Sequence, residues 1–75
     1  MGTDLLSRIK CGDTATIKSF EDFDLSMKMI EMGCSSGQKV RIVHTAPFNG
    51  PIAFEFDCSM IAMRKEEAET IIVES

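Results

Sequence analysis

Residues 38–45 (QKVRIVHT), 46–51 (APFNGP) and 52–57 (IAFEFD) form the stretch of sequence that decides the fold. In the first and third segments, apolar side chains alternate with polar ones, which is typical of a strand with one buried and one solvated face. The Asn49-Gly50 pair in the middle segment is a strong turn signal. The stretch therefore predicts two antiparallel strands joined by a turn.

Short strands are also predicted on both sides of this hairpin. Residues 14–20 (TATIKSF) are rich in β-branched side chains and alternate, while residues 59–64 and 71–73 are short runs with apolar positions. Residues 65–69 (KEEAE) resemble a single helical turn. The opening residues 3–9 have a turn-like pattern, in which Thr3 or Asp4 is a candidate cap.

One helix is predicted between the first two strands. Asp24 is a candidate N-cap, because its side chain can accept a hydrogen bond from a free backbone N–H. The helix then runs from Leu25 to Met32, and Leu25, Met29 and Met32 fall at positions i, i+4 and i+7 of one face. Gly33 follows where a helix commonly ends in a left-handed residue. We expect this face to be core and Met27, Lys28 and Glu31 to face outward.

These elements predict a mainly β domain covering residues 1–75. Five short strands, one helix after the first strand and a short helical turn before the last cannot fill a sandwich. They suit a small, strongly bent barrel, since closure removes exposed edges. The chain is 44% hydrophobic and 27% charged, as expected for a globular domain. Seventy-five residues leave little room for a deep active-site cleft.

Charge and cysteine content exclude several functional classes. The net charge of -4 and the scattered basic residues argue against nucleic-acid binding, which needs clustered Lys and Arg. Three widely spaced cysteines, Cys11, Cys34 and Cys58, do not suggest a disulfide framework and favour a reducing compartment. The N-terminus shows no signal peptide, and no apolar run approaches the ~20 residues of a spanning helix. We therefore expect a cytoplasmic protein that does not insert into a membrane.

Candidate chemical sites are few. His44 could pair with Cys34 or Cys58 as base and nucleophile, and a barrel could gather the three cysteines around a metal. Glu21, Asp22 and Asp24 could hold a hard cation weakly, although such a run is usually a solvated loop and cap. The glycines match no phosphate-binding loop. We expect no catalytic residue, no metal ligand and no required cofactor. Weak binding of Fe²⁺ or Zn²⁺ is left as an open alternative.

The loop after the second strand is the predicted partner-binding surface. Pro47 and Pro51 bracket Phe48-Asn49-Gly50 and stiffen it, so little entropy is lost when the loop docks. Phe48 would supply the apolar anchor, and Lys28, on an outer helix face beside the loop, would supply a steering charge for an acidic partner. The competing interpretation is that Phe48 folds back and caps the open end of the barrel.

Four segments resemble the ferrous iron transport protein A (FeoA) family from about residue 6 to residue 73. They are 9–13 (IKCGD), 29–37 (MIEMGCSSG), 46–52 (APFNGPI) and 62–68 (AMRKEEA). The sequence departs from the family where Met27 and Lys28 stand in place of a frequent arginine. It departs again where Ser36 replaces a proline.

The resemblance implies an SH3-like barrel and a role in ferrous iron uptake. The expected activity is non-enzymatic contact with the cytoplasmic part of FeoB, the membrane transporter of ferrous iron. The alternative function is a divalent-metal-responsive regulatory domain, because the same fold occurs at the C-terminus of iron-dependent repressors. The sequence does not indicate whether the protein is a monomer or an oligomer.

Overall fold

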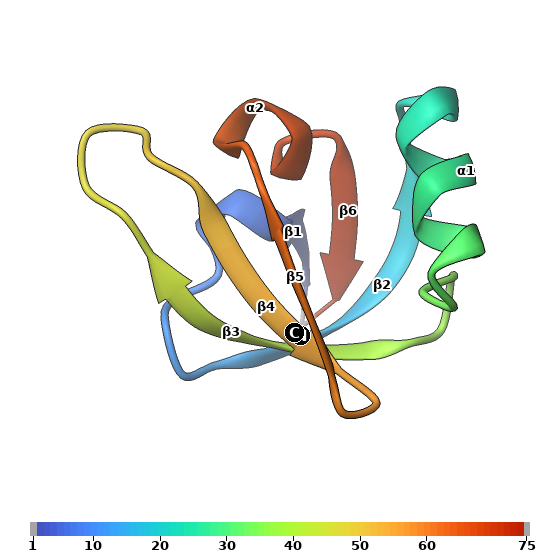
Figure 1. The fold of residues 1–75 in the computed structure, drawn as a ribbon, viewed down its shortest axis with the longest axis horizontal. Helices are drawn as coiled ribbons and strands as arrows, with labels where there is room; N and C mark the ends of the chain where they lie inside the picture. The colour runs from blue at the N-terminus through green and yellow to red at the C-terminus, as the bar shows by residue number, and fades with distance from the viewer. Residues whose placement is uncertain (1, 75) are drawn as a thin grey trace.

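In the computed structural model, residues 2–74 are described, and they form one six-stranded antiparallel sheet (Figure 1). The elements in chain order are β1 (Thr3–Leu5), the 3₁₀ helix η1 (Leu6–Arg8), β2 (Thr14–Phe20), α1 (Phe23–Glu31), β3 (Lys39–Thr45), β4 (Ile52–Phe56), β5 (Ser59–Met63), α2 (Lys65–Ala68) and β6 (Ile71–Glu74). The strand order is β1-β6-β2-β3-β4-β5, so β1 and β5 are the two edges. The mainly β prediction is confirmed.

The turn-like interpretation of residues 3–9 is wrong for residues 3–5, which form β1, and agrees with residues 6–8, which form the single 3₁₀ turn η1. Asp4 caps no helix: its Oδ1 accepts from the next backbone N–H, that of Leu5, at 2.8 Å. Strand β1 pairs antiparallel with β6, and Leu5 lies opposite Ile72. A three-residue strand has too few alternating positions to give a recognisable sequence pattern. It forms because it pairs with β6, almost seventy positions away in the chain.

Helix α1 begins two residues earlier than predicted, at Phe23. The N-cap is Asp22, whose Oδ1 accepts from the backbone N–H of Leu25 at 3.2 Å. Asp24 therefore lies in the first turn, where a carboxylate interacts favourably with the helix dipole.

The end of α1 corrects one residue of the predicted buried face. Met32 is the C-cap and is 49% exposed, whereas Met29 is fully buried. Gly33 has φ +88°, and its N–H donates to the Ile30 carbonyl while that of Cys34 donates to the Met29 carbonyl. This hydrogen-bond pattern reverses the chain and turns Cys34 inward. Cys34, fully buried, takes the place that periodicity assigned to Met32.

The core lies inside the bent sheet and under α1. Its largest fully buried side chains come from η1, α1, the α1–β3 connection and every strand except the two edges: Leu6, Ile17, Met29, Cys34, Val40, Ile42, Phe54, Ile71 and Val73. The edge strand β5 contributes Met63, and α2 contributes Ala68. No helix within residues 2–74 is long and apolar enough to cross a membrane.

Candidate functional site

The β3–β4 loop, residues 46–51, projects from the sheet (Figure 1). The Ala46 N–H donates to the Pro51 carbonyl, and the Gly50 N–H donates to the Pro47 carbonyl, both at 3.1 Å. Two prolines and two cross-loop hydrogen bonds therefore fix the backbone at the base and at the tip. Such a loop loses little conformational entropy when a partner docks on it.

Phe48 stands at the tip of this loop with its side chain in solvent. It is 99% exposed, the highest value among the large apolar residues, and its φ is +57°. A bulky residue in the left-handed region is strained, and a fully exposed phenyl ring gains nothing from the fold. The alternative that Phe48 caps the open end of the barrel is excluded, because a cap would be buried.

The turn is centred one residue earlier than the Asn49-Gly50 signal predicts. Phe48 and Asn49, with φ +57° and +62°, are the left-handed pair, and the Gly50 N–H closes the turn. Gly50 serves close approach instead, because a Cβ there would lie 2.5 Å from the Cβ of Ala46. A turn with two left-handed residues matches the twist of the flanking strands.

The loop tip is also held from the side. Lys65, at the start of α2, donates a hydrogen bond from Nζ to Oδ1 of Asn49 at 2.9 Å. Behind this contact, α2 and the residue after it carry the carboxylates of Glu66, Glu67 and Glu69. The apolar tip therefore stands next to a mostly acidic surface.

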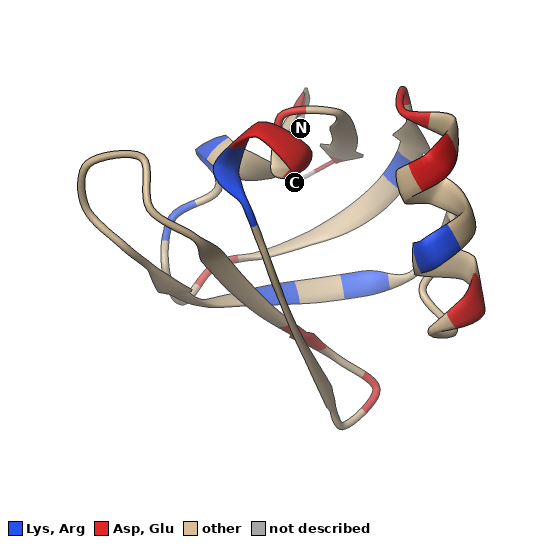
Figure 2. Ribbon diagram, turned by 45° about the horizontal axis from the view of Figure 1, so that its top comes forward, with Lys and Arg blue, Asp and Glu red and all other residues tan. Residues whose placement is uncertain are grey.

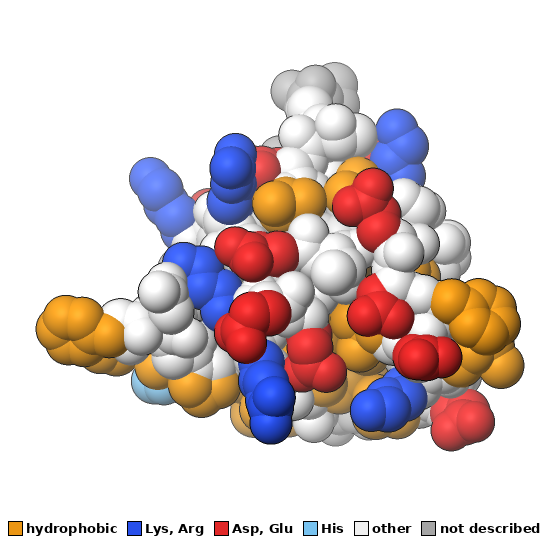
Figure 3. All heavy atoms as spheres, turned by 90° about the horizontal axis from the view of Figure 1, so that it is seen from above, with side chains coloured by type: hydrophobic (Ala, Val, Ile, Leu, Met, Phe, Trp, Pro, Cys, Tyr) orange, Lys and Arg blue, Asp and Glu red, His pale blue; other side chains and the backbone are white. Residues whose placement is uncertain are grey.

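Lys28 does not lie beside the loop, so the predicted joint surface is wrong in its geometry. It is exposed on α1, and α1 and the loop lie at opposite sides of the molecule (Figure 1). Figure 3 shows hydrophobic side chains at both margins, over the loop and over α1, with acidic side chains between them. The α1 margin includes Phe23, Met27 and Ile30, which are 75%, 45% and 53% exposed.

The candidate metal ligands are not brought together, and His44, which lies opposite Ala53 near the start of β4, is separated along the hairpin from Cys58, which follows the end of β4. Within residues 2–74, no three His, Cys, Asp or Glu side chains are close enough to share a metal ion. Cys11 is exposed and its Sγ donates to the Val43 carbonyl at 3.4 Å, while Cys58 is exposed in the β4–β5 turn. Burial raises the pKa of the Cys34 thiol to about 11, so this thiol stays protonated at neutral pH and is a poor nucleophile.

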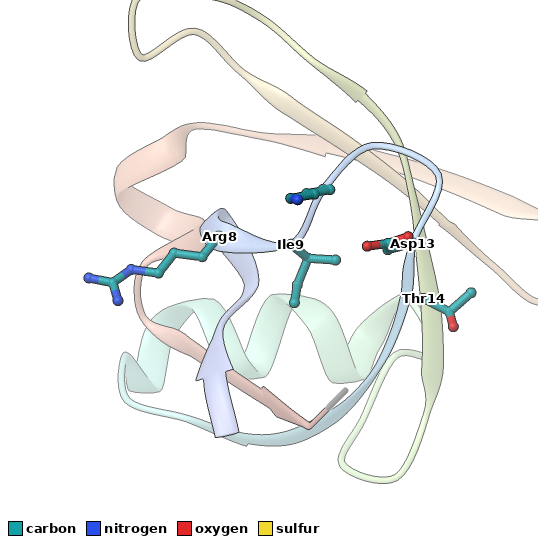
Figure 4. A pocket seen from close by; sticks show the side chains of 5 residues that line it. Arg8, Ile9, Asp13 and Thr14 are labelled. Atoms are coloured by element: carbon teal, nitrogen blue, oxygen red, sulfur yellow. The ribbon is translucent and has the colours of Figure 1, made fainter. Parts of the chain in front are cut away.

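Three of the surface depressions are lined by charged residues of both signs. One of about 360 Å³ is lined by Arg8, Ile9, Lys10, Asp13 and Thr14. In Figure 4 the Arg8 guanidinium points away from Asp13 and Thr14, on the other side of Ile9. The Arg8 guanidinium and the Asp13 carboxylate therefore do not converge on one point, as they would around a bound ion or substrate.

The sequence profile of the FeoA domain matches residues 5–75, which is most of the chain. The chain belongs to the FeoA domain family. The match covers the four segments on which the resemblance rested, and it includes the β3–β4 loop and both helices.

Solved structures of FeoA proteins share the fold. Iron(II) transport protein A from Clostridium thermocellum is 38% identical with a TM-score of 0.84, over 95% of this chain and 44% of that protein. FeoA from Stenotrophomonas maltophilia, a prokaryotic SH3 domain protein complexed with zinc, is 24% identical with a TM-score of 0.82, over 95% and 89% of the two chains. The SH3-like prediction is thereby confirmed.

The fold also occurs within a larger regulator. A manganese-dependent transcriptional repressor is 23% identical with a TM-score of 0.86, over 97% of this chain and 41% of the repressor. This FeoA domain thus spans less than half of the repressor and of the Clostridium thermocellum protein. No curated protein matches the chain in sequence.

The three cysteines of this FeoA domain are free, and their burial predicts how they react. We expect an exposed-thiol reagent to modify two cysteines in the native protein, Cys11 and Cys58, and a third only after denaturation. Cys34 is protected because it is fully buried and its pKa is raised. Thiol counting by mass spectrometry with and without denaturant checks this. A single reactive thiol in the denatured, unoxidised protein would show that a disulfide forms.

Proposed function

We propose that this chain is a non-enzymatic, cytoplasmic accessory protein of ferrous iron uptake, acting by contact with the cytoplasmic part of a FeoB-type transporter. Membership in the FeoA family supports the assignment to ferrous iron transport. The observation that carries the mode of action is Phe48, a fully exposed aromatic ring on a strained and braced turn. A fold retains such a residue at a cost to itself, and a buried aromatic anchor is what small interfaces use.

The proposed contact surface consists of Phe48 with Pro47 and Pro51, all three exposed. Phe48 would insert into an apolar pocket, and the two prolines would pack around its rim. Lys28 lies at the opposite side of the molecule, so we propose it as a charge that steers the encounter and not as part of the same contact. The molecule is 27 Å long and the Debye length at physiological salt is only ~8–10 Å, so we expect this steering only at low ionic strength (~0.01 M), where the Debye length reaches ~30 Å.

Replacing Phe48 tests this function. We expect Phe48→Ser to weaken binding to the isolated cytoplasmic part of the transporter by roughly 1–3 kcal/mol, measured by calorimetry, because the anchor is lost. The melting temperature should barely move, since the ring contacts no core residue. Phe48→Asn should weaken binding equally and fold at least as stably, because Asn tolerates the left-handed region.

The matched control is Phe23→Ser, which removes another exposed ring, on α1. It should leave transporter binding unchanged if the loop is the contact. Unchanged affinity and stability for Phe48→Ser would make the loop a bystander. A wild-type protein that does not bind the cytoplasmic part would overturn the proposed partner.

A divalent-metal-responsive domain is the second candidate. It is supported by the zinc in the Stenotrophomonas maltophilia FeoA structure and by the likeness to a manganese-dependent repressor. No preformed cluster of ligands exists within residues 2–74, so any ion would bind weakly. Titration with Fe²⁺ under reducing conditions, and with Zn²⁺, separates the candidates. A saturable rise in melting temperature at one ion per chain favours the metal-responsive function.

A further inference from the structure

Strand β5 is an edge strand without the protection that edge strands usually carry. Its sequence, Ser59 to Met63 (SMIAM), has no charged residue and no proline. Met60 is 66% exposed, and Ser59 and Ala62 are exposed. The opposite edge, β1, has only three residues and carries Asp4, which lies 3.9 Å from Arg8. An uncharged, accessible edge is a template on which another strand can pair.

The hairpin fixes which backbone groups of β5 face the open side. Strands β4 and β5 are joined by a two-residue turn, Asp57 and Cys58, with Phe56 opposite Ser59. In such a hairpin, alternate residues of β5, beginning with Ser59, bond to β4. The N–H and C=O groups of Met60 and Ala62 therefore point to the free edge. No hydrogen bond between residues 2–74 uses them there.

Opposite charges stand at the two ends of this edge. Asp57 precedes β5 and Arg64 follows it, and both are exposed. Neither takes part in an ion pair within the described part of the chain. Figure 2 shows β5 as a tan strand between a red segment at the turn and a blue segment at the start of α2.

We propose that β5 is a self-association surface, on which the β5 strand of a second copy pairs antiparallel. A two-fold axis through Ile61 places Met60 of each copy opposite Ala62 of the other. These are the residues whose backbone groups face the free edge, so four backbone hydrogen bonds form across the axis. The sheets of the two copies then become one continuous sheet, as in other interactions by strand addition.

Charge complementarity favours a second copy over an unrelated extended peptide. In the same register, Asp57 of one copy lies near Arg64 of the other, and the dyad repeats this contact at the opposite end. An unrelated strand would have to supply a basic and an acidic residue at the same spacing. The strand is short, so the dimer is a weak one that forms at micromolar to millimolar concentration.

The test uses the protein alone and is independent of the transporter. We expect sedimentation velocity to show a monomer that becomes a dimer as concentration rises, with weaker association at high salt. In hydrogen exchange followed by NMR, the amides of Met60 and Ala62 should gain protection with concentration, while that of Ser59 should not change. A wild-type protein that stays monomeric up to millimolar concentration overturns the proposal.

Two methionines provide a matched pair of variants. Met60→Lys places a charge on the edge of each copy and should weaken dimerisation at least tenfold, whereas Met27→Lys, on exposed α1, should not change it. Ala62→Pro removes an outward N–H and leaves the β4 pairing intact, so it should also abolish the dimer. Circular dichroism checks that each variant folds. A dimer lost in folded Met27→Lys, or retained in folded Met60→Lys and Ala62→Pro, shows that the copies associate through another face and overturns the proposal.

Discussion

Replacing Phe54 by alanine should lower the free energy of unfolding by about 3–5 kcal/mol. Phe54 is fully buried at the centre of β4, where Ile42 of β3 and Ile61 of β5 flank it in the sheet. Its ring also lies 6.4 Å from that of Phe56. Alanine would remove most of this contact area and leave a cavity that the closely paired strands cannot fill.

The expected loss is a large share of the total stability. A domain of this size is stable by about 4–11 kcal/mol, and each kcal/mol corresponds to about 4–8 °C in melting temperature. Urea unfolding followed by circular dichroism measures the change. Phe54→Leu retains more of the volume and should cost less, which keeps the measurement possible if the alanine variant does not fold.

Phe23→Ala is the matched control for Phe54→Ala. The chemical change is identical, but Phe23 is 75% exposed at the start of α1. We expect a change of less than about 0.5 kcal/mol. Similar losses at the two positions would show that the buried face of β4 has been assigned to the wrong side of the sheet.

The second large effect is expected at Met29, the central buried residue of α1. Met29→Ala should lower the free energy of unfolding by about 2–4 kcal/mol, because this fully buried side chain fills the space between the helix and the sheet. The neighbouring Lys28 is exposed, so Lys28→Ala should change the free energy of unfolding by less than about 0.5 kcal/mol.

Met32→Ala distinguishes the prediction made from the structure from the one made from helical periodicity alone. Periodicity places Met32 on the buried face and predicts a loss comparable to that of Met29→Ala. The structure exposes Met32 and buries Cys34 instead, so a loss below about 1 kcal/mol is expected. Thermal and urea unfolding of the three variants measure these differences. Equal losses at Met29 and Lys28, or a large one at Met32, would contradict the observed register.

The sequence predicted the elements whose signals are local. Strand 14–20 was predicted with the bounds that β2 has, and β3, β4 and β5 were each predicted to within one residue at either end. Alternation fixes the inward face of a strand, and glycine at position 33 marks the left-handed end of α1. The family resemblance was also readable, because its motifs are short segments in a fixed order.

The candidate site was predicted only in part. The loop containing Phe48 could be found, because prolines, asparagine and glycine mark turns wherever they occur. Its exposure and the left-handed backbone at Phe48 could not, since Asn49-Gly50 offered a competing position for the same turn. The separation of Lys28 from the loop could not be predicted either, because it depends on where the sheet places α1.

Long-range pairing and packing decided the rest. Strand β1 exists because its residues find β6 from the other end of the chain, and the pattern of residues 3–9 holds no trace of that partner. Cys34 is buried because the chain reverses direction at Gly33. Helical periodicity applies only within the helix, so it cannot predict the burial of a residue beyond this reversal. The sequence by itself therefore determined which segments are strands and helices and which family they build. Which side chain completes the core after α1, which edge stays open and which side chains share a surface were decided only by the tertiary structure, because these depend on contacts between residues far apart in the chain.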